Sequence, residues 1–371
     1  MSHGEAAEAW RWIDNNADLQ RVVDAAAEAP FIAIDTEFRR RDTFYPEVAL
    51  LQVATDAATW LIDPLAVDDV TALRTLLAGG DRPRVLHSAS EDLEVFERWL
   101  GCLPTPMVDT QKAAAMLGLG FGLGYRSLVA LLLDIDLSKE ETQSDWLARP
   151  LTPAQCQYAA QDVIHLARCW PLLKAQAEGR GILPWIFEES AAMSTGGKGP
   201  LARFKSAWKL RPREQVILAA LVEWREGEAK SRDKPRNWVL QDKVISALAR
   251  KRPSSLPQLG AIEGMPSGLV RRNGDLLLEI IATSEEGPLP PLPRPAGPDA
   301  KALARELVPE LTTIATGLGM SPEILMSVRD LEALVEHTTG TANTASSQWS
   351  GWRHEAVVVP LQQRITALAG G

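Results

Sequence analysis

Short apolar runs alternate with amphipathic helical patterns through the first half of the chain. Residues 31–34 (Phe-Ile-Ala-Ile) form an uninterrupted apolar run, preceded by proline and followed by charge, as in the centre of a sheet. Residues 16–29 and 69–77 instead repeat apolar positions at helical spacing. Strands alternating with helices predict an α/β sheet domain with sites at strand ends. The pattern predicts five strands, at 31–34, 48–54, 59–62, 84–87 and 106–109.

The pattern changes after residues 194–200, a linker rich in small residues. Helical periodicity follows, is interrupted at 285–298, and resumes over 299–368. The six prolines of the interruption indicate a semi-rigid polyproline-type spacer rather than a core element. We therefore predict three domains, of which the second and third are helical: 1–190, 203–285 and 299–371.

Two carboxylates, Asp35 and Glu37, stand at the end of the first apolar run. Side chains at i and i+2 of a strand point to one face, so these acids should lie side by side. Like charges so close raise each other's pKa unless a cation holds them, and magnesium or manganese is the natural partner of carboxylate oxygens. For an isolated Asp-x-Glu pair, a solvated strand exit is the commoner interpretation.

Two further acids follow, each with two interpretations. Asp92 comes after the fourth strand, where it either favours a helix start with Ser90 as N-cap or faces the same crevice as the first pair. Tyr158 and Asp162 lie four residues apart on a helix that Thr152 caps. They form either a hydrogen-bonded surface pair, the commoner case, or part of a metal crevice.

Four carboxylates with a nearby hydroxyl suit metal-assisted cleavage of a phosphodiester. Two divalent ions about 3.5–4 Å apart stabilise the attacking and leaving oxygens, and a hydroxyl can orient the attacking water. The glycines of residues 118–124 do not have the Gly-x-Gly-x-x-Gly spacing of a dinucleotide loop, and no apolar strand precedes them. We interpret that segment as a flexible connector.

The net charge of -9 gives no global signature of nucleic-acid binding, so any such contact must be local. Residues 203–250 reverse the sign, with twelve Lys and Arg against six Asp and Glu. Trp208, Trp224 and Trp238 are interleaved there. Basic and aromatic side chains together can grip phosphates and stack bases, although the first two tryptophans fit better in the core of a helical bundle.

The three cysteines have no zinc-like spacing, and their odd number fits a reducing compartment. The first residues lack a secretory signal, and no apolar run approaches the roughly 18 residues of a membrane span. These features predict a soluble protein of the cytoplasm.

The acids stand in three stretches that resemble the DEDD 3′→5′ exonucleases of the tyrosine-containing subgroup, most closely the ribonuclease D family. These are 34–38 (Ile-Asp-Thr-Glu-Phe), 90–96 (Ser-Glu-Asp-Leu-Glu-Val-Phe) and 158–162 (Tyr-Ala-Ala-Gln-Asp), and segment 143–151 matches as well. Each motif is weak alone, but their order and separations are specific. The resemblance implies a ribonuclease-H-like fold with a mixed five-stranded sheet over about residues 1–190.

The resemblance also implies a site with two divalent metal ions, Mg²⁺ or Mn²⁺. It implies that Asp35, Glu37 and Asp162 bind the ion on the nucleophile side. Asp35 would bridge to the second ion, supported by Asp92 directly or through water, and Tyr158 would orient the attacking water. Contacts to the terminal nucleotide are implied for four further residues: Thr36, Phe38, His87 and Trp146.

Two of these contact residues have an equally good structural interpretation. His87 at a strand end fits a hydrogen-bonded structural histidine. Trp146 fits a packing residue.

Residues 203–285 resemble an HRDC domain, an accessory module that binds or positions nucleic acid, and 299–371 resemble a second, more divergent one. We therefore expect a monomeric, metal-dependent exoribonuclease that trims RNA 3′ ends and releases 5′-mononucleotides. The family's substrate class implies transfer RNA precursors. One alternative is a DNA 3′→5′ exonuclease on the same fold. The other is an inactive RNA-binding adaptor, which would be expected to lack one of the five site residues; all five are present.

Overall fold

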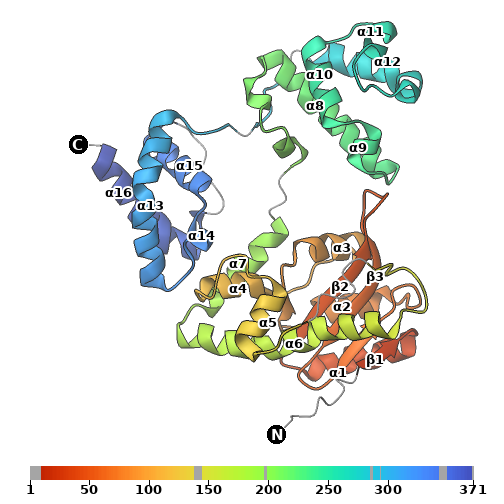
Figure 1. Cartoon of the computed structure of the whole chain (residues 1–371), viewed down its shortest axis with the longest axis vertical. Coiled ribbons are helices and arrows are strands. Elements are labelled where there is room, and N and C mark those ends of the chain that lie inside the picture. Colours follow the sequence, from red (N-terminus) through yellow and green to blue (C-terminus); the bar gives the residue numbers. More distant parts are fainter. Residues whose placement is uncertain are drawn as a thin grey trace. The chain divides into compact units, whose positions relative to one another are not determined.

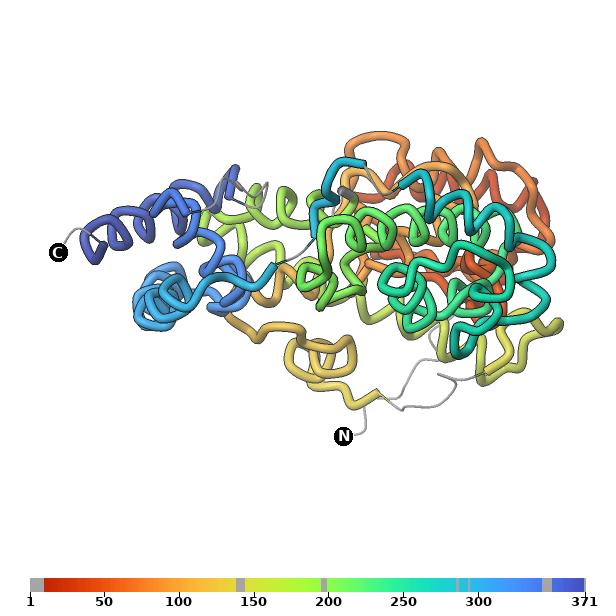
Figure 2. The backbone as a smooth tube through the Cα atoms, turned by 90° about the horizontal axis from the view of Figure 1, so that it is seen from above, coloured from red at the N-terminus to blue at the C-terminus, as the bar shows by residue number. Residues whose placement is uncertain are grey.

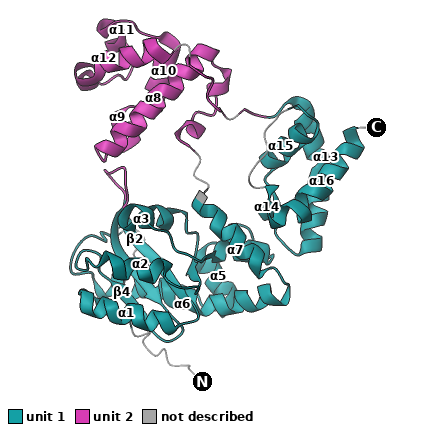
Figure 3. Cartoon of the chain, turned by 180° about the vertical axis from the view of Figure 1, so that it is seen from behind, with its two compact units in different colours: residues 1–39, 47–196, 296–371 teal, residues 40–46, 197–295 magenta. Residues whose placement is uncertain are grey.

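The computed structural model describes six ranges of the chain: 10–137, 144–195, 199–284, 287–292, 294–341 and 349–369. Gln143 of the matched segment and parts of both predicted linkers lie outside the described residues. No helix within the described ranges is both long enough and apolar enough to cross a bilayer. The chain forms two compact units (Figure 3): unit 1 comprises 1–39, 47–196 and 296–371, and unit 2 comprises 40–46 and 197–295.

Unit 1 is built on a mixed sheet flanked by helices (Figure 1). The strand order of this sheet is β1-β4-β3-β2-β5-β6. β3 runs antiparallel to both β2 and β4, and the other neighbours are parallel. The sheet has one strand more than the sequence predicts, because residues 10–13 pair with β4 at the edge. The strands are β1 (Trp10–Ile13), β2 (Ile32–Arg39), β3 (Glu47–Ala54), β4 (Thr59–Ile62), β5 (Arg84–Leu86) and β6 (Met107–Asp109).

Helices cover both faces of this sheet. On one face, Ile34 and Leu51 pack into a cluster with residues of α1, α2 and α3. On the other face, Leu50 packs with Ala159 and Ala160 of α6. Because successive side chains of a strand alternate, one apolar strand fills two cores. The helices of this part are α1 (Asn16–Glu28), α2 (Val70–Ala78), α3 (Ser90–Leu100), α4 (Thr110–Met116), α5 (Tyr125–Leu133), α6 (Pro153–Gly179), α7 (Leu183–Ala191) and the 3₁₀ turn η1 (Ala192–Thr195).

The C-terminal helices belong to unit 1 as well. α13, α15 and α16 lie side by side (Figure 2). Trp352 stacks on Trp185 of α7 with ring centroids 5.3 Å apart, and Arg353 pairs with Glu189 at 2.6 Å. One apolar cluster joins residues of α6 and α7 to these helices. They are α13 (Pro298–Leu318), α14 (Pro322–Leu325), α15 (Val328–Thr338), the π-helical turn η6 (His354–Val358) and α16 (Val359–Ala369).

Unit 2 is a helical bundle with its own apolar core. Trp224 is half-buried and packs against that core, as expected for a bundle residue, whereas Trp238 is 64% exposed. Trp208 is half-buried, with the Lys209 ammonium 5.4 Å from its ring centre. The elements are η2 (Pro200–Arg203), η3 (Ala207–Lys209), α8 (Pro212–Ser231), α9 (Arg236–Val239), α10 (Asp242–Lys251), α11 (Leu256–Gly260) and α12 (Ser267–Thr283).

The loop between β2 and β3, residues 40–46, belongs to unit 2 although its flanking strands belong to unit 1. Phe44 is buried against Ala229 and Val239. The Asp233 carboxylate accepts the backbone N–H groups of Phe44 and Tyr45 at 2.9 and 3.0 Å. Asp35 and Glu37 lie on β2. The loop that connects β2 to β3 therefore belongs to unit 2.

Candidate active site

β2 presents Asp35 and Glu37 to the α6 side of the sheet. Asp35 lies opposite Gln52 of β3, and Glu37 lies opposite Leu50, whose side chain packs under α6. Directly opposed residues of an antiparallel pair share a face, so both acids point towards α6. A register irregularity between Glu37 and Phe38 then ends the regular pairing. The predicted side-by-side arrangement of the two acids follows from this register.

α6 supplies Tyr158 and Asp162. Its start is fixed as the sequence predicts: Thr152 is the N-cap, and its side chain and that of Gln155 form a reciprocal capping box. Pro153 occupies the first turn, where its missing N–H costs nothing. The Tyr158 hydroxyl hydrogen-bonds to the Asp162 carboxylate one turn further on. The pair therefore lies on the face that covers the β2 acids, not on the open surface.

Asp92 reaches the same site from α3. The expectation that Ser90 caps this helix was wrong, because α3 begins at Ser90 and its N-cap is Ala89, with no side-chain cap. The Asp109 carboxylate holds the preceding turn by accepting the Ala89 N–H at 2.9 Å. Asp92 itself is buried and accepts a hydrogen bond from the Thr36 hydroxyl.

Burial raises the pKa of all four acids, and the charges of neighbouring acids add to the shift at Asp35 and Glu37. Burial first, and then the charges of Asp92, Asp162 and Glu37, hold the pKa of Asp35 well above its ordinary value. The same causes raise the pKa of Glu37 to about 8. Burial raises the pKa of Asp162 to about 7 and that of Asp92 to about 6, while hydrogen bonds from Tyr158 and Thr36 oppose these shifts. Four buried or half-buried acids in one cluster, with the pKa of Asp35 and Glu37 raised by their neighbours, make a site for cations.

Oxygen-only donors of this kind suit hard divalent ions such as Mg²⁺ and Mn²⁺. Within the described ranges, no group of three or more His, Cys, Asp or Glu side chains is arranged as it stands to hold a metal ion. The charges of Asp92 and Asp162 nevertheless raise the pKa of both Asp35 and Glu37, so the four acids lie near one another. The donor set fits a metal site that a cation would draw together.

The four residues with implied nucleotide contacts differ in their surroundings. Thr36 is buried and its hydroxyl is engaged by Asp92, while Phe38 is half-buried. His87 bonds to the Thr110 hydroxyl through Nδ1 at 2.9 Å, and burial lowers its pKa. Trp146 is buried, with its ring centroid 6.1 Å from that of Tyr158. Trp146 therefore packs beside the site.

Two neighbours of the acids carried little signal in the sequence. Tyr125 opens α5 and donates its hydroxyl to the Gln161 carbonyl at 2.9 Å. Its pKa is raised by burial and then by the charge of Asp162, which places it near the acids. Gln52 is fully buried opposite Asp35, and neither of its amide atoms has a protein partner. A polar residue within an apolar strand was the only sequence signal for Gln52.

Comparison with known proteins connects this geometry to a family. Residues 10–178 match the family model described as 3'-5' exonuclease, and residues 214–281 match that of the HRDC domain. The chain is 40% identical to the ribonuclease D of Pseudomonas paraeruginosa over 93% of this chain and 94% of that one. It is 32% identical to that of Escherichia coli K12 over 96% and 98%.

The chain belongs to the ribonuclease D family. The crystal structure of E. coli RNase D, described as "an exoribonuclease involved in structured RNA processing", superposes with a TM-score of 0.85 at 31% identity. The superposition covers 97% of this chain and 99% of that one. The ribonuclease D relationship confirms an enzyme with a 3′→5′ exonuclease domain followed by a helical HRDC region. Exonucleases of this family are generally dependent on divalent metal ions.

Proposed function

We propose that the chain hydrolyses RNA from the 3′ end, releases 5′-mononucleotides and uses two divalent metal ions at the β2–α6 site. The observation that carries this proposal is the cluster of Asp35, Glu37, Asp92 and Asp162 beside Tyr158, in which the charges of neighbouring acids raise the pKa of Asp35 and Glu37. The ions would supply charge stabilisation for the attacking and leaving oxygens of the phosphodiester. Asp35, Glu37 and Asp162 would hold the ion on the nucleophile side. Asp35 would also bridge to the second ion, with Asp92 in support.

Tyr158 would position the attacking water. Burial and the charge of Asp162 raise the pKa of its phenol above the ordinary value, so the hydroxyl stays protonated at neutral pH. A protonated phenol that donates to Asp162 keeps its oxygen lone pairs for a water hydrogen. Tyr158 would therefore orient the nucleophile, and a carboxylate would take the proton.

The terminal nucleotide would lie against the exit of β2. Phe38 follows Glu37 directly and is half-buried, so part of its ring is available to wedge a base. Trp146 packs against Tyr158 and would hold that ring in position. Thr36 would hold the Asp92 carboxylate in position through its hydrogen bond. His87 is held by its bond to the Thr110 hydroxyl and its Nε2 is buried, which favours the structural interpretation of this histidine over a contact to the nucleotide.

We propose transfer RNA precursors and other RNA 3′ ends as substrates, acted on by a monomer in the cytoplasm. The described E. coli relative, named for structured RNA processing, favours RNA over DNA. The three cysteines are free, which suits a reducing compartment.

The test is nucleotide release from a 3′-labelled single-stranded RNA with Mg²⁺ or Mn²⁺, with a DNA of equal sequence alongside. Asp35→Asn should slow release at least about 100-fold, because it removes a carboxylate shared by the proposed ions. EDTA should abolish release. Glu97→Gln, an exposed acid on α3, is the matched control and should be unaffected. Binding of RNA without release, or faster release from DNA, would refute the proposal.

A further inference from the structure

One guanidinium of unit 1, that of Arg149, is bonded at all five of its N–H positions. Nε and Nη2 donate to the Asp63 carboxylate at 2.8 and 2.7 Å. Nη1 donates to the carbonyls of Trp146 and Ala148 at 2.8 and 2.9 Å. Nη2 also donates to the Ala49 carbonyl at 2.6 Å. Since an arginine side chain has five N–H donors in a fixed fork, protein acceptors saturate this one.

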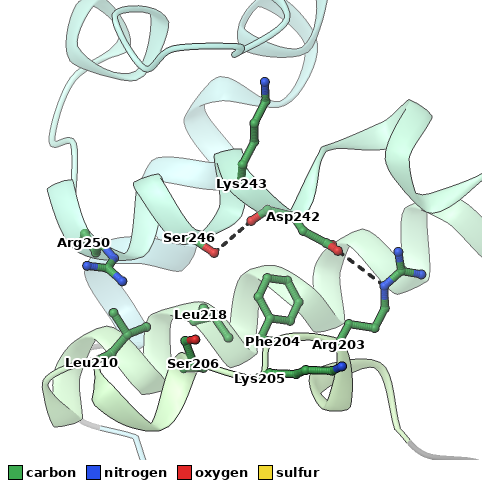
Figure 4. Close-up of a pocket in the computed structure, with 11 residues that line it drawn as sticks. Arg203, Phe204, Lys205, Ser206, Leu210, Leu218, Asp242, Lys243, Ser246 and Arg250 are labelled. Carbon is green, nitrogen blue, oxygen red and sulfur yellow. Dashed lines mark hydrogen bonds and ion pairs between the residues drawn. The ribbon is translucent and has the colours of Figure 1, made fainter.

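The bidentate pair is also shielded from water. Asp63 is buried and Arg149 is half-buried, with the guanidinium carbon 5.7 Å from the centre of the Trp12 ring. By comparison, the Arg203–Asp242 pair at the edge of a pocket in unit 2 is looser, with Nε 3.4 Å from Oδ2 (Figure 4). Shielded bidentate pairs hold their geometry, whereas exposed pairs contribute little. Arg149 can therefore fix the backbone groups to which it donates.

One of these backbone groups lies on the strand opposite the acids. The β2–β3 register skips Ala49, which falls between the partners of Glu37 and Phe38. Ala49 is therefore an extra residue on β3, and it is fully buried. A bulge of this kind re-aims the side chains beside it and is common next to active sites. Its buried carbonyl needs a hydrogen-bond donor, and the guanidinium supplies one.

Another of these backbone groups lies beside the tyrosine. The Trp146 carbonyl accepts from Nη1, and the buried ring of the same residue has its centroid 6.1 Å from that of Tyr158. Ala49 and Trp146 belong to one apolar cluster, and Tyr158 packs against it. Arg149 therefore holds Trp146, and with it the Tyr158 ring, against the bulged strand that pairs with β2.

We propose that Arg149 is a positioning residue for phosphodiester hydrolysis, which sets the orientation of the Tyr158 hydroxyl through Trp146. The proposal rests on the proposed function, because that function gives Tyr158 the task of orienting the attacking water. Because protein acceptors engage all of its donors, Arg149 would contact neither the RNA nor the ions. Its loss should therefore lower kcat and leave KM nearly unchanged. A displacement of about 1 Å in a group that orients a reactant can cost up to about 100-fold in rate.

The first test is steady-state hydrolysis of a 3′-labelled single-stranded RNA by variants of the full chain. Arg149→Lys keeps the charge but offers only the three donors of one nitrogen, so it should lower kcat about tenfold and leave KM within about twofold. Asp63→Asn removes the charge of the acceptor and should act in the same direction. Arg21→Lys, in the exposed pair of Arg21 with Asp18 on α1, is the matched control and should behave like the native protein.

A double-mutant cycle separates positioning from general damage. In a Tyr158→Phe background the hydroxyl is already absent, so adding Arg149→Lys should lower kcat by less than about twofold further. Trp352→Ala, which removes a ring stacked on α7, controls for lost stability and should leave kcat unchanged well below its melting temperature. Equal losses from Arg149→Lys with and without the Tyr158 hydroxyl would overturn the proposal.

The second test needs no catalysis. The chain has three tyrosines, so 3-fluorotyrosine labelling gives few ¹⁹F resonances, and Tyr158→Phe identifies the one that belongs to Tyr158. The neighbouring Trp146 ring affects the position of that resonance. In the metal-free protein, Arg149→Lys and Asp63→Asn should move it towards the value of an unpacked tyrosine. Arg21→Lys should leave it in place.

The two tests distinguish failure of this proposal from failure of the proposed function. Absence of nucleotide release by the native protein, with the Tyr158 resonance moved by Arg149→Lys, would refute the proposed function and support the positioning of Tyr158. Release by the native protein, with kcat or the resonance unchanged in Arg149→Lys, would refute the positioning role alone. A large rise in KM at unchanged kcat would also overturn it, because that result would place Arg149 in RNA binding.

Discussion

At the scale of single residues, the site is defined by groups that are unfavourable on their own. Asp35 lies half-buried among three other acids whose charges raise its pKa, and Gln52 is buried without a partner opposite Asp35. Such groups cost stability, and they persist where function requires them. The sequence predicted the acids, because their motifs and spacing are local. It did not predict the environment of Gln52 or Tyr125, because that depends on which strand or helix lies opposite.

The first prediction concerns pH. The pKa values of Glu37, Asp162 and Asp92 are raised to about 8, 7 and 6, so the folded metal-free protein keeps protons that the unfolded chain has released. The stability that this gives is fully present below the unfolded values, and it is lost as pH rises through the folded ones. The metal-free melting temperature should therefore fall by about 5 °C or more between pH 5.5 and pH 8.5.

Asp162→Asn should reduce the fall in the metal-free melting temperature between pH 5.5 and pH 8.5. Glu97→Gln should leave this fall unchanged. Mg²⁺ or Mn²⁺ should raise the melting temperature more at pH 8.5 than at pH 5.5, because ligands bind ions in the deprotonated form. A metal-free melting temperature that is flat or rises over this range would contradict the assignment.

The second prediction concerns the buried amide. Gln52→Met keeps the side-chain length and removes two polar atoms without partners, so the metal-free protein should become more stable by about 1 kcal/mol. Urea unfolding would measure the change. Gln176→Met at an exposed position of α6 is the control, with an expected effect near zero. Destabilisation by Gln52→Met would instead indicate an internal water that satisfies the amide.

At the scale of elements, the sequence was reliable where the signal is local. The apolar runs predicted β2 to β6, and Thr152 with Pro153 predicted the start of α6. β1 was missed because a four-residue edge strand acquires its identity from parallel pairing with β4, far along the chain. The start of α3 was misjudged because the Asp109 carboxylate, from another strand, holds the preceding turn.

The third prediction tests the α6 capping box. Thr152→Ala removes the acceptor for the Gln155 N–H and should cost about 1 kcal/mol of unfolding free energy. Thr152→Ser keeps the hydroxyl and should stay within a few tenths of a kcal/mol of the native value. Denaturant midpoints would compare the two. Equal losses in both variants would show that the threonine methyl, and not the cap, stabilises this end of α6.

At the scale of the whole molecule, composition separates the chain into segments but does not show which of them pack together. The sequence predicted boundaries near the two linkers, and residues 296–371 nonetheless share unit 1 with the sheet. The contacts responsible join Glu188 and Trp352, which are 164 residues apart in the chain. No local pattern carries that information.

The fourth prediction tests this packing with a matched pair of tryptophans. Trp352→Ala removes a buried ring stacked on Trp185 and should lower the unfolding free energy of unit 1 by about 3 kcal/mol. Trp238→Ala removes a ring that is 64% exposed and should cost less than about 1 kcal/mol. Loss of sheet signal during urea unfolding is the measurement. If Trp352→Ala and Trp238→Ala have similarly small effects on the free energy of unfolding, the C-terminal helices unfold separately from the sheet.

The divided sequence of unit 1 also sets an order in time. Ribosomes add about 5–20 residues per second, so the sheet and α6 emerge many seconds before the last helices of their own unit. During that interval the Trp185 ring lacks the partner that arrives with Trp352. Phe44 likewise waits for α8 and α9. The nascent chain therefore exposes two apolar surfaces that the finished molecule does not, and both are places where a chaperone would be expected to bind.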